Sequence, residues 1–270
     1  MTMMHLQIEH HTEYHYENPV RYSIQEIRLQ PSSSHSQSIL NWKIQSPIRA
    51  KSNQDAFGNT CQTFVLDSPY KSMTITAKGE VKSMGGYEQS DPENAISPFY
   101  LLQPSTLTDI SIEMQDHFAS VLPKKADLDS VIKLANAVRE SIKYQVGVTN
   151  FATTAIQAFA ARAGVCQDHS HVMLSLCRFA NIPARYVSGY FFAEESPNLA
   201  SHAWVDVCIS PEQGKWFSID VTHACVTDDR HIRLAIGRDY YSAAPIKGIR
   251  SGGGMEELDA NISIQQVKVL

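Results

Sequence analysis

The chain has 270 residues, 43% of them hydrophobic and 19% charged, so it can bury a sizeable core and is not composed like a disordered protein. Its formal net charge of -5, with no run of Lys or Arg, gives no electrostatic case for a nucleic-acid or lipid partner. The sequence has no apolar stretch of the ~20 residues that a membrane span needs, and its start does not read as a signal peptide. Five irregularly spaced cysteines are no disulfide framework, so we expect a cytoplasmic protein.

The first third of the chain predicts antiparallel strands. Apolar and polar residues alternate in several segments, which are residues 6–16, 20–31, 41–47, 60–66 and 72–84. Asn18-Pro19 separates the first two of these segments, and residues 55–59 have the composition of a turn. Short strands at near-even spacing predict an antiparallel, sandwich-like β-rich domain over residues 1–90.

A change of period follows a predicted linker. Residues 84–98 are rich in Gly, Pro, Ser, Asp and Glu, as linkers are. Residues 128–142 then carry an apolar stripe with a 3.6-residue period behind Asp127, a good N-cap, and therefore predict a helix. A short helix is predicted over residues 153–162, with Gly164 as its terminator.

The rest of the chain predicts one more helix and then strands. The helix runs over residues 166–180, and the strands that follow are residues 184–193, 201–210 and 215–223. The turn-like "SPEQGK" between the last two strands predicts an antiparallel hairpin. We assign residues 91–245 to an α+β catalytic core and residues 246–270 to C-terminal strands that could return to the first domain.

Cys166 lies at the predicted start of a helix, directly after Gly164-Val165. A thiol attacks only as a thiolate, and the free N–H groups and positive dipole end of a helix N-terminus favour that form. The same N–H groups can hold an oxyanion, and Gly164 would let a substrate backbone come close. A lone cysteine is more often a packing residue, so this reading requires a partner base.

The predicted hairpin supplies a base and an orienting group for Cys166. His202 lies on its first strand and Asp220 on its second, directly opposite or diagonal, within ~7–8 Å. Asp220 would accept the imidazole N–H and fix the tautomer, and the other ring nitrogen would face the thiol. The order Cys, His, Asp thus predicts one nucleophilic mechanism.

A zinc site is the alternative for the same region, because Cys166-x-x-His169 is followed by His223-x-Cys225. His169 and His171, however, lie two residues apart on a helix, about 200° around its axis, so they cannot both face one ion. We therefore expect no metal and no cofactor.

Residues 228–240, "DDRHIRLAIGRDY", are unusually rich in charge next to this candidate site. They predict either a solvated loop or a rim that contacts the substrate or clamps the active-site strands. Three consecutive glycines at residues 252–254 lack the lysine and helix of a phosphate loop and predict a flexible turn.

Three separated segments, in this order, resemble the bacterial transglutaminase-like superfamily, whose members are often described as cysteine proteases. They are "GVCQDHSHVMLSLCR", "SHAWVDV" and "FSIDVTHACVTDDRHIRLAIGRDY". The start, "HHTEYHYENPVRYSIQEIRLQP" with "DAFGN" after it, resembles the β-rich N-terminal domain that accompanies this core.

The resemblance implies a papain-like or transglutaminase-like α+β core, in which the helix that bears the cysteine packs on an antiparallel sheet. Cys166 would be the nucleophile, His202 the base and then the acid, and Asp220 the orienting group. This chain departs from the family at Val221, where a proline is usual, and at His169, where an aromatic residue is common.

The predicted activity is thiol-dependent acyl transfer on an amide or isopeptide bond of a peptide or protein, most simply hydrolysis by a protease or amidase. Gly164, Gln167, Trp204 and His169 are the candidates for contact with the substrate or the oxyanion. Two alternatives stay open: a protein-glutamine amine transferase that crosslinks proteins, and a non-catalytic peptide-binding module.

Overall fold

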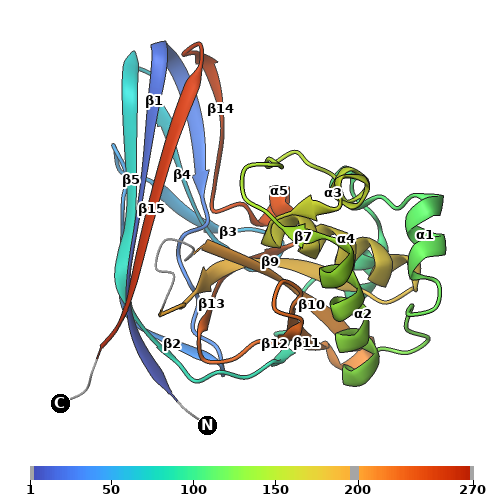
Figure 1. Ribbon diagram of the computed structural model, residues 1–270. Coiled ribbons are helices and arrows are strands. Elements are labelled where there is room, and N and C mark those ends of the chain that lie inside the picture. The colour runs from blue at the N-terminus through green and yellow to red at the C-terminus, as the bar shows by residue number, and fades with distance from the viewer. Residues whose placement is uncertain (1–2, 195–200, 268–270) are drawn as a thin grey trace.

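Two curled antiparallel sheets and a group of helices make up the molecule, whose computed structural model describes residues 3–194 and 201–267. Figure 1 shows the N-terminal sheet standing as a tall wall on one side and the helices on the other, with the second sheet between them. The fold is α+β, as predicted.

The N-terminal sheet is built around one long strand, β1 (Met4–Ile27). The other strands of this sheet are β2 (Gln37–Gln45), β3 (Lys51–Gln54), β4 (Thr60–Leu66), β5 (Tyr70–Ser83), β14 (Ile246–Gly252) and β15 (Glu256–Gln266). Their order is β2-β5-β1-β4-β3, and β14 and β15 both pair with β1. Strands from the two ends of the described chain therefore share one sheet.

The predicted break at Asn18-Pro19 is wrong, because β1 runs through it without ending. Proline has no N–H to give to a sheet and is tolerated where pairing is irregular. Here the register with β5 shifts between His15 and Val20, and Pro19 falls inside that shift. One strand therefore stands where the pattern predicted two.

The second sheet carries the residues of the predicted core. Its strands are β6 (Glu88–Ser90), β9 (Ala184–Phe191), β10 (Ser201–Ser210), β11 (Lys215–Asp220), β12 (Cys225–Val226) and β13 (His231–Gly237). The order is β12-β11-β10-β9-β13, and β10 and β11 form the predicted hairpin around a short 3-10 turn, Pro211–Gln213. β6 pairs with β11, so part of the predicted linker is a strand of this sheet.

The helices lie against the second sheet. They are α1 (Ile112–Phe118), α2 (Leu128–Ser141), α3 (Ala155–Ala161), α4 (Cys166–Phe179) and α5 (Tyr240–Ala243), with 3-10 turns at Pro98–Leu102 and Thr106–Thr108. The predicted cap of α2 is confirmed, since the Asp127 carboxylate accepts the N–H of Ser130 at 2.9 Å. In the described part of the chain, no helix is long and apolar enough to cross a bilayer.

The predicted terminator of α3 is wrong. The helix ends at Arg162, which adopts the left-handed conformation (φ 52°) usually given to glycine. Gly164 lies beyond it in the short strand β8 (Ala163–Gly164), which pairs with β7 (Lys143–Tyr144).

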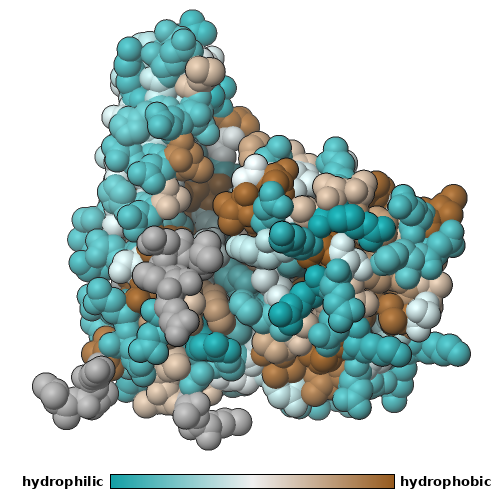
Figure 2. Space-filling view, in the orientation of Figure 1, coloured by the Kyte–Doolittle hydropathy of each residue, from teal (hydrophilic) through white to brown (hydrophobic). Residues whose placement is uncertain are grey.

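Two hydrophobic cores hold the layers together. In the first, α4 packs on β9 and β10 through fully buried residues such as Val172, Leu174 and Leu176. In the second, the inner face of the N-terminal sheet packs on Ile232 and Leu234 of β13. Figure 2 shows a mostly hydrophilic surface over the tall sheet and a hydrophobic hollow where it meets the rest of the molecule. The two sheets are therefore joined by a shared core.

Candidate active site

Cys166 is the first residue of α4, the helix buried between the second sheet and the other helices. The turn before it is fixed by Asp168, whose carboxylate accepts the N–H of Val165 and the hydroxyl of Thr149, each at 2.7 Å. Burial raises the pKa of Asp168 despite these two hydrogen bonds. Cys166 therefore stands at a helix tip whose N-cap backbone is held from within the same turn.

Gly164 serves this turn rather than a substrate. A Cβ at this position would lie 2.6 Å from the side chain of Asp168, so only glycine leaves room for the capping carboxylate. The prediction that Gly164 admits a substrate backbone is corrected accordingly, since the open space beside its Cα is filled by Asp168.

His202 links the thiol to the hairpin. Its Nε2 donates to Oδ2 of Asp220 at 2.8 Å, and the thiol of Cys166 lies near enough to the same imidazole to help raise its pKa. Burial opposes protonation of the ring, but the charge and hydrogen bond of Asp220 and the contact with Cys166 outweigh it and raise the pKa of His202 to about 10. The surroundings of the ring therefore favour its protonated form.

The pairing of the hairpin explains how His202 reaches Asp220. Val205 and Ile219 are paired, so Asp220 lies opposite Trp204 and diagonal to His202. This is the diagonal arrangement that the sequence allowed, and two side chains on one sheet face can meet across such a diagonal.

Asp220 receives hydrogen bonds from three histidines. Besides His202, Nδ1 of His223 donates to Oδ2 at 2.7 Å and Nε2 of His231 donates to it at 3.0 Å, while the backbone N–H of His223 donates to Oδ1 at 3.1 Å. Burial disfavours the anion, but the charge of His202 and the hydrogen bonds of the three rings hold the pKa of Asp220 well below its usual range. The orienting group is thus a firmly held carboxylate.

The sequence reasoning missed the roles of His223 and His231. It considered His223 only as a zinc ligand and placed His231 in a charged loop. The dense polar run "DVTHACVTDDRHI" after β11 was the available signal, because it surrounds one buried carboxylate with nearby histidines.

The potential metal ligands that lie close together are not the set that the sequence predicted for zinc. Ligand atoms of His202, Asp220 and His223 lie within 4.8 Å of one another, a spacing that a metal ion needs. Both imidazoles, however, already donate to the carboxylate oxygen that an ion would have to take. His169 of the predicted set is occupied elsewhere, through Thr222 and the Ile142 carbonyl, at 3.0 Å each. The cluster of His202, Asp220 and His223 is therefore held together by hydrogen bonds.

The other predicted contact residues have partners within the protein, and of these residues only His169 also lines the cavity beside His202. His169 is 1% exposed, burial lowers its pKa, and its Nε2 donates to the Ile142 carbonyl. The Gln167 amide donates to the carbonyl oxygens of Asn150 and Phe151, 3.4 Å each, and so holds a neighbouring loop. Trp204 is corrected as a substrate contact, because it is 2% exposed and packs edge-on against His231.

A cavity of about 520 Å³ opens beside the imidazole of His202. Tyr144, His169, Phe191 and His223 contribute to its wall. Burial raises the pKa of the Tyr144 phenol, and the charge of the nearby Cys166 raises it further. The cavity therefore adjoins His202 and His223, two of the histidines that donate to Asp220.

Comparison with known proteins agrees with this arrangement. Residues 6–82 match the bacterial transglutaminase-like N-terminal region, and residues 116–221 match the transglutaminase-like superfamily. An uncharacterized protein of Mycobacterium leprae is 27% identical over 98% of this chain and 100% of its own length. A protein-glutamine gamma-glutamyltransferase of Pseudomonas aeruginosa is 33% identical over 35% of this chain and 16% of its own.

The fold has a close counterpart among solved structures. A crystal structure described as a "Putative Cysteine Protease from Cytophaga hutchinsonii" covers 100% of this chain and 92% of its own, with a TM-score of 0.77 at 20% identity. At that identity the likeness is one of fold. By the two family matches, residues 116–221 belong to the transglutaminase-like superfamily, and residues 6–82 form a bacterial transglutaminase-like N-terminal region.

Proposed function

We propose that this protein is a thiol-dependent acyl-transfer enzyme that hydrolyses an amide or isopeptide bond of a peptide or protein. Cys166 is the nucleophile, His202 the base and acid, and Asp220 the orienting group. One observation carries the proposal: the imidazole near the Cys166 thiol donates through Nε2 to a buried carboxylate at 2.8 Å.

The steps follow from this geometry. The Cys166 thiolate attacks the carbonyl carbon, an S–C bond forms, and the carbonyl π electrons move to oxygen. The N–H of Cys166, at a helix N-terminus and without an intrahelical acceptor, can donate to that oxyanion. His202 gives the proton on Nδ1 to the leaving amine as the C–N bond breaks, which leaves a thioester. His202 then removes a proton from water, and the hydroxyl oxygen displaces the thiolate as a carboxylic acid forms.

Access of water supports hydrolysis as the second half of the reaction. The side chain of His223, which lines the cavity beside His202, is 48% exposed, and Tyr144 on the same wall is 40% exposed. A thioester formed on Cys166 would therefore face an opening to solvent. Crosslinking enzymes need a site that keeps water from this intermediate.

Transfer to an amine is the second candidate. It is favoured by the similarity of part of this chain to the protein-glutamine gamma-glutamyltransferase of Pseudomonas aeruginosa. The chemistry is the same up to the thioester, and only the second nucleophile differs.

One experiment separates these readings. Peptide and isopeptide libraries are incubated with the protein, with and without a primary amine, and products are identified by mass spectrometry, with Cys166→Ala as the control. Hydrolysed products that the amine leaves unchanged support the proposal, and amine adducts support the second candidate. Binding of a peptide without any product, in the wild type as in Cys166→Ala, would contradict both and indicate a non-catalytic binding module.

We further propose that the protein acts in a reducing compartment such as the cytoplasm. All five cysteines lie in the described residues and are free thiols, and Cys166 and Cys225 are only partly buried. Fractionation of cells that express the full chain checks this, and recovery outside the cytoplasm would contradict it.

A further inference from the structure

β13 is the edge strand of the second sheet, and two side-chain amides of the N-terminal sheet cover its open edge. The amide of Gln37 donates to the carbonyl of Arg233 at 2.9 Å and accepts its N–H at 2.8 Å. The amide of Asn59 does the same for Ile236, at 2.7 and 2.8 Å. Each amide takes the place that a peptide group of a neighbouring strand would occupy.

The spacing of these two contacts depends on an irregularity in β13. In a regular strand, backbone groups that face one edge recur at every second residue. Arg233 and Ile236 are three apart, and both face outward because the register with β9 shifts between Arg233 and Ala235. Gln37 and Asn59 are 2% and 6% exposed, so water cannot readily replace either amide.

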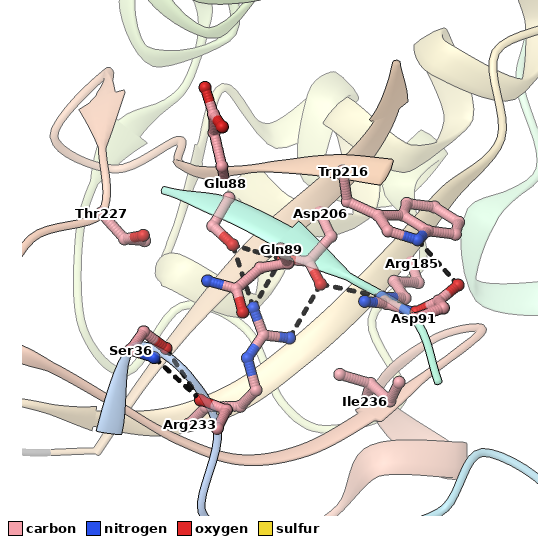
Figure 3. Close-up of polar contacts among 12 residues, drawn as sticks. Ser36, Glu88, Gln89, Asp91, Arg185, Asp206, Trp216, Thr227, Arg233 and Ile236 are labelled. Carbon is pink, nitrogen blue, oxygen red and sulfur yellow. Dashed lines mark hydrogen bonds and ion pairs between the residues drawn. The ribbon is translucent and has the colours of Figure 1, made fainter. Parts of the chain in front are cut away.

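The side chains of β13 divide between the two halves of the molecule. Ile232 and Leu234 are buried in the core of the N-terminal sheet. Arg233 points the other way and donates to Asp206 at 2.7 and 2.8 Å, and Asp206 also binds Arg185 (Figure 3). Side-chain contacts on both faces of β13 therefore hold this strand in place.

His231 is the first residue of β13, and each of its ring nitrogens has a hydrogen-bond partner. Nε2 donates to Oδ2 of Asp220 at 3.0 Å, and Nδ1 lies 3.1 Å from the backbone nitrogen of Asp228, whose carboxylate binds Arg230. Trp204 packs on the ring with a centroid distance of 5.4 Å. The side chain is 2% exposed. His231 touches the orienting carboxylate but lies behind it, away from the cavity.

We propose that His231 is a positioning residue for Asp220, and that the N-terminal sheet keeps it in place through the amides of Gln37 and Asn59. This inference rests on the proposed function of Cys166 and His202. Without the His231 contact, the Asp220 carboxylate turns toward His223, its remaining second donor, and His202 loses its alignment with the thiol. The N-terminal sheet thus takes part in catalysis without touching the substrate.

The test measures the reactivity of the Cys166 thiol beside His202, so it needs no known substrate. The rate of Cys166 alkylation by iodoacetamide is followed by mass spectrometry across pH, together with thermal unfolding, in the full chain. Gln37→Met removes the amide contact on Arg233, and Gln45→Met, an exposed position on the same strand, is its matched control. His231→Phe removes the contact on Asp220, and His231→Gln restores a donor of similar reach.

We expect Gln37→Met and His231→Phe to slow Cys166 alkylation near neutral pH by about tenfold. A shift of the curve of alkylation rate against pH by about one pH unit has this effect. His231→Gln and Gln45→Met should stay close to the wild type. If Gln37→Met does not fold, Asn59→Ala tests the other amide. A lower melting temperature with an unchanged alkylation profile would indicate a purely structural role and overturn the inference. Slow, equal alkylation of all five thiols in the wild type would instead contradict the proposed function itself.

Discussion

The indole ring of Trp204 lies across Gly189, on the face of the sheet that carries His202. Gly189 is paired with His202, and a Cβ at position 189 would overlap with the ring and with the carbonyl of Ile232. A glycine is therefore needed so that Trp204 can lie across this strand and pack edge-on against His231.

Gly189→Ala is expected to destabilise the protein by about 1–3 kcal/mol, the usual cost of overpacking a dense interior. It should also slow the reaction, since Trp204 must move and supports His231. Urea unfolding and Cys166 alkylation measure the two effects. An unfolding free energy equal to that of the wild type would show that the sheet accommodates the added methyl group without strain.

Cys166 should be the first thiol to react with iodoacetamide near neutral pH. Burial raises the pKa of the other four thiols, to about 11 for Cys61 and Cys225 and about 12 for Cys177 and Cys208. Mass spectrometry of partly labelled protein gives the order of reaction. His202→Ala should remove the preference, and its persistence in that variant would exclude His202 as the partner of the thiol.

The pKa of His202, raised to about 10 from an ordinary 6.5, predicts a pH dependence of stability. A raised pKa stabilises the folded state fully below about 6.5, and this contribution is lost as pH rises through about 10. Unfolding free energy should therefore fall over that window, and kcat/KM should lose its imidazolium acid near the upper end. His202→Gln should flatten this part of the stability curve, and an equally steep decline in that variant would assign it to another group.

Asp220→Asn should leave the fold intact and reduce kcat by roughly 10⁴, because the amide favours the wrong imidazole tautomer. Single-turnover kinetics on a substrate from the library screen measure this loss, and circular dichroism checks the fold. Turnover at the wild-type rate would remove Asp220 from the mechanism.

Asp206→Asn should act on stability. Asp206 is fully buried between Arg185 and Arg233; burial disfavours its anion, but the charges of the two guanidinium groups hold its pKa well below the usual range. Removing the charge takes away the carboxylate that pairs with Arg233 and leaves Arg185 with Asp91 alone, which costs about 3–5 kcal/mol. Asp67→Asn, at an exposed position, is the control and should change little. Equal unfolding midpoints of the two variants would contradict this account.

Local sequence patterns were enough for much of the fold and for the core of the site. The cap at Asp127, the α4 start at Cys166 and the hairpin that carries His202 and Asp220 are short-range features, which periodicity and turn chemistry describe well. A hairpin also fixes which residues lie diagonal to each other, so the His202–Asp220 contact followed from counting along two strands.

The parts that escaped prediction depend on the capping geometry of one turn and on contacts between separate segments. Gly164 was assigned to a substrate because its true neighbour, Asp168, reaches it only through the capping geometry of α4. His231 and Asp220 meet because the sheet curls, and the Arg233 backbone meets Gln37, 196 positions away in the chain. Neither relationship leaves a periodic trace in the sequence.

The pairing of β14 and β15 with β1 has a consequence for biosynthesis. β1 is translated more than two hundred positions before two of its partners, so the edges that pair with β14 and β15 stay open until residues 246–266 have been translated. Such distant pairing slows folding and leaves β1 open to wrong partners in the meantime. We expect nascent chains that stop before residue 246 to recruit chaperones or aggregate, even though every residue of the thiol–imidazole–carboxylate cluster has already emerged.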